Sequence, residues 1–203
     1  MTLWAIVPVK PLAKGKTRLA NSLGPAERAQ LNREMFEHVL IELAAVAEVE
    51  RTLVVSRDSA VLALARDKGA RTLSERQPAE LNRALERATG AAQAYGASGV
   101  LILPADLPLV TRDDIRALVA LGARPPVVVI APDRRGEGTN ALLVSPIGLI
   151  EYAFGANSYQ RHLKEAAASG ARLEVCDVVR LTIDVDLPED LALVREAQRS
   201  RPA

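Results

Sequence analysis

Leu101-Ile102-Leu103-Pro104-Ala105-Asp106-Leu107-Pro108 is a short apolar run that ends in an aspartate between two prolines. Such a run is typical of a strand that is buried on both faces of a parallel sheet. The prolines fix the backbone on either side of the aspartate, so the Asp106 carboxylate has a defined direction. Open α/β sheets bind ligands at the carboxyl ends of their strands. We therefore expect Asp106 to lie at the ligand-binding edge of such a sheet.

The same order of strand and then helix recurs along the whole chain. Apolar or β-branched runs predict strands over residues 3–9, 52–56, 100–103, 127–131, 141–145, 173–175 and 181–185. Helical spacing and capping residues predict helices over residues 25–47, 58–69, 78–95, 111–122 and 158–170, and from residue 188 onward. This alternation predicts one α/β domain over residues 1–203, with a mostly parallel mixed sheet and helices on both faces.

Composition limits the class of protein. The chain has 203 residues and a formal net charge of +1, so neither a nucleic-acid-binding surface nor an acidic tail is expected. Cys176 is the single cysteine, which fits a reducing, cytoplasmic environment. The apolar run 3–9 ends at Lys10 and is too short for a signal segment or a membrane span. The long helix over 25–47 could serve as core or as the interface of a homodimer.

A second acidic segment, Asp184-Val185-Asp186, follows the apolar run Leu181-Thr182-Ile183. Alternation along a strand would place both carboxylates on the same side. Two carboxylates so close repel each other unless a cation neutralises them, and Mg²⁺ favours a few carboxylates together with phosphate oxygens. Asp186 could instead cap the helix that begins at Pro188. The sequence therefore favours Asp184 as a metal ligand and divides Asp186 between the two roles.

A basic loop directly follows the first strand. It runs from Lys10 to Leu19 and carries four cations, Lys10, Lys14, Lys16 and Arg18. A turn that frees backbone N–H groups, together with lysine and arginine side chains, is suited to phosphate binding. The glycine spacing does not match that of a Walker loop. A solvated basic turn remains the alternative.

Two glycine-containing segments offer hydrogen-bond donors to a small ligand. Residues 133–140 include two glycines, Thr139 and Asn140, and could also form a simple hairpin turn. Residues 154–158 lead with Gly155 into a helix that begins at Ser158, whose free N–H groups would suit a phosphate or a carboxylate. His162, one turn further on, is expected to be a packed or exposed residue without a chemical role.

In this order, the segments resemble the 2-phospho-L-lactate or phosphoenolpyruvate guanylyltransferases of coenzyme F420 biosynthesis (CofC/FbiD-like). The resemblance spans nearly the whole chain, and it rests on the combination of Val7-Pro8-Val9-Lys10-Pro11, Lys16-Thr17-Arg18-Leu19, Leu81-Asn82-Arg83-Ala84-Leu85, Pro104-Ala105-Asp106-Leu107-Pro108, Gly138-Thr139-Asn140, Phe154-Gly155 with Ser158, and Asp184-Val185-Asp186. It implies a single-domain nucleotidyltransferase fold of the glycosyltransferase-A type.

The resemblance also implies a reaction and a set of site residues. GMP would pass from GTP to phosphoenolpyruvate, releasing diphosphate and forming enolpyruvoyl-2-diphospho-5'-guanosine. By the family's pattern, Mg²⁺ would be held by Asp106, Asp184 and Asp186, GTP by Lys10, Lys16, Arg18 and Asn82, and the acceptor by Thr139, Gly155 and Ser158. Of these residues, Lys16, Arg18 and Asp106 would be catalytic.

Several alternatives stay open at the level of the sequence. The acceptor could be 2-phospho-L-lactate or 3-phosphoglycerate, which share a carboxylate and a phosphate with phosphoenolpyruvate. More distantly, the chain could be a molybdopterin or nucleotide-sugar type of nucleotidyltransferase, or a nucleotide-binding regulatory module without turnover. Since the acceptor phosphate is already anionic, none of the transferase reactions needs a general base, in keeping with the lack of a recognisable serine or cysteine nucleophile beside a histidine.

Overall fold

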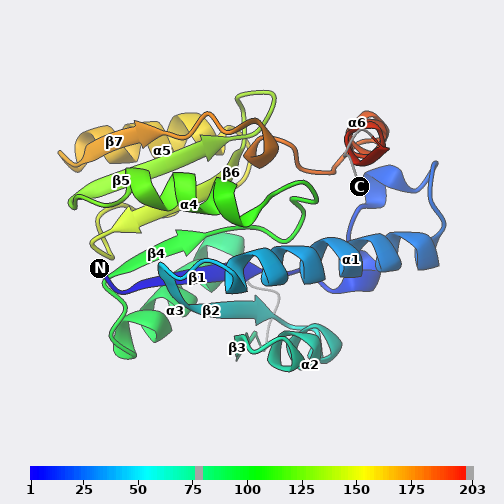
Figure 1. The fold of residues 1–203 in the computed structure, drawn as a ribbon, viewed down its shortest axis with the longest axis horizontal. Helices are drawn as coiled ribbons and strands as arrows, with labels where there is room; N and C mark the ends of the chain where they lie inside the picture. The colour runs from blue at the N-terminus through cyan, green and yellow to red at the C-terminus, as the bar shows by residue number, and fades with distance from the viewer. Residues whose placement is uncertain (76–79, 200–203) are drawn as a thin grey trace.

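The computed structural model describes residues 1–75 and 80–199, which form a three-layered α/β structure (Figure 1). The strands are β1 Leu3–Pro8, β2 Val49–Ser56, β3 Arg71–Ser74, β4 Gly99–Ile102, β5 Val127–Pro132, β6 Thr139–Ser145 and β7 Arg172–Val175. The helices are α1 Pro25–Ala44, α2 Ser59–Asp67, α3 Leu81–Ala94, α4 Arg112–Leu121, α5 Ser158–Ala168 and α6 Pro188–Arg199. Residues 78–79 of the predicted helix 78–95 lie outside the described residues.

The seven strands form one sheet in the order β3-β2-β1-β4-β6-β5-β7. β6 is antiparallel to both of its neighbours, β4 and β5, and the other pairs are parallel. This confirms the predicted mostly parallel mixed sheet. Because β6 runs the other way, its first residue, Thr139, lies at the edge where β1, β2, β3 and β4 end.

Both faces of the sheet are covered, because successive side chains of each buried strand point to opposite sides. In β1, Leu3, Ala5 and Val7 pack in one cluster with residues of α1, α2 and α4. Trp4 and Ile6 pack in a second cluster with residues of α3 and α5. Figure 1 shows α1 and α4 in front of the sheet and α3 and α5 behind it.

A third, smaller cluster joins the two ends of the chain. Leu19 and Met35 pack there with Leu191 and Val194 of α6, and Val185 is fully buried among them. The inner face of α1 is core, with Phe36, Val39 and Leu43 buried, although Ile41 remains half exposed. Among the described helices, none is long and apolar enough to cross a membrane.

Two sequence-based assignments differ from the structure. Residues 181–185 do not form the predicted strand: Val179–Leu181 is a 3₁₀ turn, Thr182 is a bend with helical backbone angles, and residues 183–185 belong to no strand. The backbone of this segment bonds to loops at the edge of the sheet instead, as when Arg134 N donates to Thr182 O at 2.8 Å. Conversely, β3 was missed, because Arg71–Ser74 is a short edge strand without a buried apolar run.

α4 begins with a capping box between Thr111 and Asp114, which is tied to the C-terminal part of the chain. The Asp114 carboxylate accepts hydrogen bonds from Thr111 N and from Thr111 Oγ1. It also forms a two-point ion pair with Arg180, at 2.7 Å to Nε and 2.6 Å to Nη2. Burial alone would raise the pKa of Asp114, but hydrogen bonds from Arg180 and Thr111 outweigh it, so that the pKa lies below its ordinary value.

Replacing Asp114 with alanine should lower the free energy of unfolding by about 2–4 kcal/mol, since it removes a helix cap and leaves Arg180 unpaired. Because the folded pKa is depressed, this contribution is present above about pH 4 and is lost at lower pH. Urea denaturation at pH 7 measures the change. Asp113→Ala is the matched control, because Asp113 is exposed on the same helical turn. Equal losses for the two variants would contradict the assignment.

Candidate active site

A cavity of about 500 Å³ lies at the carboxyl edge of the sheet. It is lined by the ends of β1, β2 and β4 and by the loops that follow them, including Val9, Lys10, Leu12, Lys16, Val55, Arg57, Glu75, Leu81, Ala84, Pro104, Asp106 and Asp186. A second hollow, of about 690 Å³, lies between α1 and α6 but contains none of the predicted site residues. The smaller cavity is therefore the candidate active site.

Lys16 occupies the centre of the polar wall of this cavity. Its Nζ donates to Asp106 Oδ2 at 2.6 Å and to Asp186 Oδ1 at 2.9 Å. The side chain is only 7% exposed, and its backbone is left-handed, with φ at 56°. The preceding Gly15 lets the loop turn tightly, because a Cβ there would lie 2.6 Å from Asn32 Nδ2. The loop thus delivers Lys16 to the two carboxylates.

The three predicted metal ligands lie in one electrostatic cluster. Burial, the charge of Asp106 and, more weakly, the charge of Asp186 raise the pKa of Asp184. Burial alone would lower the pKa of Lys16, but the charges and hydrogen bonds of Asp106 and Asp186 together raise it above its ordinary value. Within the described residues, no group of three or more His, Cys, Asp or Glu side chains is arranged as a metal site. The ammonium of Lys16 holds two of the three acids together.

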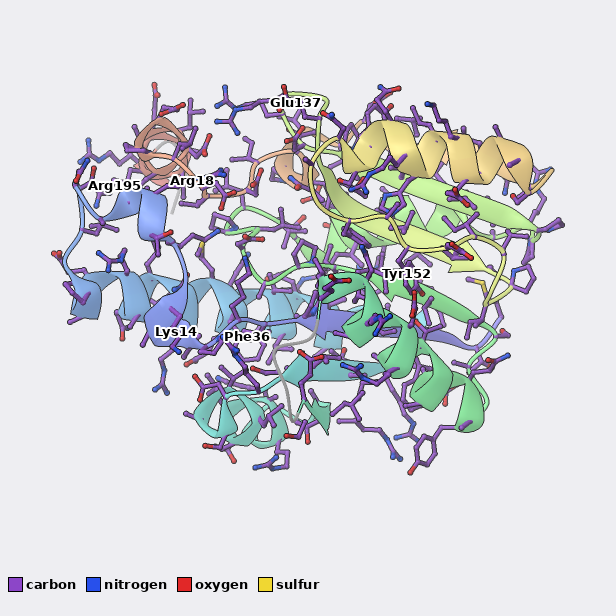
Figure 2. The ribbon with its side chains drawn as sticks, turned by 180° about the vertical axis from the view of Figure 1, so that it is seen from behind. Lys14, Arg18, Phe36, Glu137, Tyr152 and Arg195 are labelled. Atoms are coloured by element: carbon purple, nitrogen blue, oxygen red, sulfur yellow. The ribbon has the colours of Figure 1, made fainter. Side chains whose placement is uncertain are left out.

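Further cations lie near these carboxylates. Lys16 pairs with Asp106 and Asp186, and the next cation, Arg18 Nη1, lies 3.7 Å from Asp186 Oδ2 on a side chain that is 70% exposed. Asp184 interacts electrostatically with Arg135, whose pKa is raised mainly by Asp190 and, more weakly, by Asp184. Figure 2 shows Arg18 on its loop close to α6. Lys10 is exposed at the rim of the cavity.

Asp186 does not need to cap α6, because Asp190 supplies a carboxylate at the start of that helix. Asp190 Oδ2 accepts hydrogen bonds from Asp186 N at 3.1 Å and from Leu187 N at 2.8 Å. The side chain of Asp186 points instead to Lys16. Asp184 is held by Asn140, whose Nδ2 donates to its Oδ1 at 3.3 Å. Although the segment is not a strand, its side chains alternate as the sequence predicts.

The predicted acceptor residues gather around His162 on the other side of Asp106. Thr139 Oγ1 lies 2.9 Å from His162 Nδ1. His162 Nε2 accepts from Ala153 N at 3.0 Å, so the neutral ring carries its proton on Nδ1 and donates it to Thr139. Ser158 is buried as the first residue of α5. The sequence predicted free N–H groups at this helix start, but Ser158 N and Tyr159 N donate to Gly155 O and Glu137 O, each at 3.1 Å. His162 is thus packed, as predicted, and it orients Thr139.

Gly155 and Asn82 shape the loop between β6 and α5. Gly155 has φ at +118°, a conformation that L side chains rarely adopt. Asn82, the second residue of α3, donates to Phe154 O at 3.2 Å and accepts from Phe154 N at 2.8 Å. The amide of Asn82 therefore clamps this loop rather than facing the cavity. Its predicted contact with GTP stays a prediction.

The structure brings together residues from five segments and adds two that sequence reasoning missed. Lys10, Lys16, Asp106 and Asp186 line the cavity, whereas Thr139, Gly155 and Ser158 lie beyond Asp106 toward β6 and α5. Arg57 and Glu75 also line the cavity. Each directly follows a strand, β2 and β3 respectively. Because residues 52–56 were predicted as a strand, the position of Arg57 directly after it could have identified Arg57 as a site residue. Glu75 could not be found in this way, because β3 was not predicted.

His162 should make the stability of the protein depend on pH. Burial, together with the charge of Arg161, lowers its pKa from 6.5 to about 4. As the pH falls, the unfolded state therefore binds the proton first. The contribution of neutral His162 to the free energy of unfolding is complete above about pH 6.5 and falls by about 3 kcal/mol toward pH 4. Urea denaturation across this range should show a shallower slope for His162→Gln than for the unchanged protein. His38→Gln is the control, and an equal flattening by both variants would contradict the assignment.

Comparison with known proteins agrees with this geometry. The fold is that of a solved nucleotidyl transferase from Methanothermobacter thermautotrophicus, with a TM-score of 0.70 at 17% identity, over 98% of this chain and 99% of that one. Among curated proteins, the phosphoenolpyruvate guanylyltransferase of Rubrobacter xylanophilus is 43% identical over 192 residues, which cover 95% of this chain and 93% of that protein.

A second relative is named for a different acceptor. The 2-phospho-L-lactate guanylyltransferase of Methanothermobacter thermautotrophicus is 38% identical over 191 residues, covering 94% of this chain and 83% of that protein. A family model described as "Guanylyl transferase CofC like" matches residues 3–195. The family model and these relatives together show that the chain belongs to the CofC-like guanylyl transferase family.

Proposed function

We propose that this nucleotidyltransferase transfers GMP from GTP to phosphoenolpyruvate, releasing diphosphate and forming enolpyruvoyl-2-diphospho-5'-guanosine in coenzyme F420 biosynthesis. The relatives named above support this reaction, and 2-phospho-L-lactate is the alternative acceptor. In the reaction, a phosphate oxygen of the acceptor attacks the α-phosphorus of GTP. The bond from that phosphorus to the bridging oxygen breaks, and diphosphate departs with its electron pair.

One observation carries the assignment: the order of the site residues along the edge of the sheet. The cavity extends from β3 past β2 and β1 to Asp106 after β4, while Thr139 and Ser158 lie beyond it on β6 and α5. GTP bound in the cavity would therefore present its α-phosphate near Asp106, with the acceptor on the far side. That arrangement suits an in-line displacement, in which the protein mainly positions the reactants and stabilises charge.

Mg²⁺ is the metal that we propose for this site, because hard cations of this kind take oxygen ligands. Asp106, Asp184 and Asp186 supply only oxygen ligands, and their charge exceeds that of Lys16. When bound, Mg²⁺ would neutralise charge on the α-phosphate and polarise its oxygens. Lys16 keeps Asp106 and Asp186 together, and Arg18 and Lys10 offer charge to the departing diphosphate. Thr139, the loop at Gly155 and Ser158 would hold the phosphate and carboxylate of the acceptor.

The reaction is tested by incubating the protein with GTP, Mg²⁺ and one acceptor at a time, and by measuring diphosphate. Phosphoenolpyruvate, 2-phospho-L-lactate and 3-phosphoglycerate are compared, with a sugar phosphate as the acceptor of a different transferase class. We expect turnover with a small phosphorylated acid and none with the sugar phosphate. Turnover with the sugar phosphate alone, or GTP binding without any turnover, would overturn the proposal.

Asp106→Asn should lower kcat by about 100- to 1,000-fold, because it removes a charge beside the reacting phosphate while keeping the side-chain shape. Diphosphate release at saturating substrates measures the effect, and circular dichroism checks the fold. Asp177→Asn is the matched control, since Asp177 is an exposed aspartate outside the cavity. A kcat for Asp106→Asn within threefold of the control would refute this role.

Ser158→Ala should raise KM for the phosphorylated acid by roughly tenfold, because it removes one hydrogen bond to a charged group. A tenfold change corresponds to about 1.4 kcal/mol. KM for GTP should change little, because Ser158 lies on the side of Asp106 away from the cavity. Initial rates with each substrate varied in turn separate the two constants. Ser59→Ala, at the equivalent first position of α2, is the control. A larger effect on GTP than on the acid would reverse the assignment.

A further inference from the structure

The end of the cavity farthest from Asp106 is formed by β3 and α3. Ser74, the last residue of β3, pairs with Ser56 of β2, and Pro8 of β1 pairs with Val55. Three strand spacings, about 14 Å in total, separate the end of β3 from the end of β4. This span suits the ribose and base of a nucleotide whose α-phosphate lies at Asp106. Residues at the end of β3 are therefore placed to contact the base.

Glu75 is the acidic group at that end, and it is held in place. Its backbone N–H donates to Ser56 O at 3.0 Å, which extends the pairing of β3 with β2. Its Oε1 accepts from Arg87 Nη2 of α3 at 2.8 Å, and the Glu75 side chain is only 16% exposed. An ionised carboxylate has about four acceptor positions, so most remain open after this one bond. The carboxylate is thus fixed and still able to accept.

The walls beside Glu75 are apolar. Val55 and Ala84 are buried side chains that line the cavity. Leu81, also in the lining, remains 42% exposed at the start of α3, although it is a large apolar residue. A flat aromatic ring placed there would cover this exposed surface. The combination of an apolar slot and one fixed carboxylate matches a heterocyclic base that presents hydrogen-bond donors at its edge.

From these contacts we infer that Glu75 reads the guanine base of GTP, accepting hydrogen bonds from its N1–H and its 2-amino group. Guanine presents these two donors side by side, whereas adenine and cytosine each place an acceptor next to their amino group. A carboxylate can only accept, so it pairs with both donors of guanine and leaves the edge of the other bases mismatched. Arg87 positions the carboxylate. The inference rests on the proposed use of GTP and adds the residue that selects it.

The unchanged protein gives the first test. kcat/KM is measured with GTP and with ITP, which lacks only the 2-amino group, and Kd for both nucleotides is measured by calorimetry with Mg²⁺. We expect ITP to be at least about tenfold weaker in both measurements, since one charge-assisted hydrogen bond is lost. ITP equal to GTP would overturn the role of Glu75. Binding preference for GTP without diphosphate release would instead support Glu75 while overturning the proposed reaction.

The second test changes the carboxylate to an amide. Glu75→Gln should lower kcat/KM for GTP by at least about 100-fold, because the amide NH₂ then faces a donor of the base. XTP carries a carbonyl where GTP has the 2-amino group, and this carbonyl can accept from the new amide. The ratio of kcat/KM for GTP to kcat/KM for XTP should therefore be at least about tenfold lower in Glu75→Gln than in the unchanged protein. Glu86→Gln is the matched control, because Glu86 is an exposed acid on α3 next to Arg87, and it should leave both values unchanged.

A GTP-to-XTP ratio in Glu75→Gln within threefold of that in the control would overturn the inference. Circular dichroism and thermal melting check that the variant is folded. If it is not folded, the comparison of GTP with ITP in the unchanged protein decides the matter alone. Catalysis of diphosphate release by the unchanged protein with GTP is a separate result, which tests the proposed function whatever Glu75 does.

Discussion

The ammonium of Lys16 is the interaction on which the site depends. Asp106 is 90 residues away in the sequence and Asp186 is 170 residues away, and Lys16 binds both within 2.9 Å. The N-terminal loop, the loop after β4 and the segment before α6 are thereby fixed to one another. The smaller apolar cluster of Leu19, Val185 and Leu191 packs beside this contact and supports it. One buried cation therefore joins two carboxylates that would otherwise repel, Asp106 and Asp186.

The single antiparallel strand β6 has a functional consequence. In a fully parallel sheet, the edge beyond β4 would present another strand end, followed by a helix. With β6 reversed, the start of that strand brings Thr139 and Asn140 to the same edge as Asp106. Asn140 binds Asp184, and Thr139 is oriented by His162. The reversal thus places Thr139 and Asn140, the residues that we propose for acceptor binding and for support of Asp184, directly beside the acidic cluster.

Much of the fold could be predicted from local sequence, and the exceptions have physical causes. Continuous apolar runs such as Val127–Ala131 predict buried strands well, because burial on both faces excludes polar residues. β3 gave no such signal, since Arg71–Ser74 forms the edge of the sheet and is only partly buried. Residues 181–185 gave a false strand signal: Leu181 and Val185 are buried, but the backbone of the segment bonds to loops. Residue pattern reports burial more directly than it reports hydrogen-bond pairing.

The sequence by itself determined the class of fold, the acidic and basic segments of the site and the family resemblance, because each depends on residue types at short spacing. Only the tertiary structure decided which of these residues meet. It showed that Lys16 lies between Asp106 and Asp186, that Asp190 rather than Asp186 serves the start of α6, and that Asn82 clamps Phe154. It also brought Glu75 into the cavity. Such contacts join residues far apart in the chain, and strand order and helix packing set their distances, not local sequence.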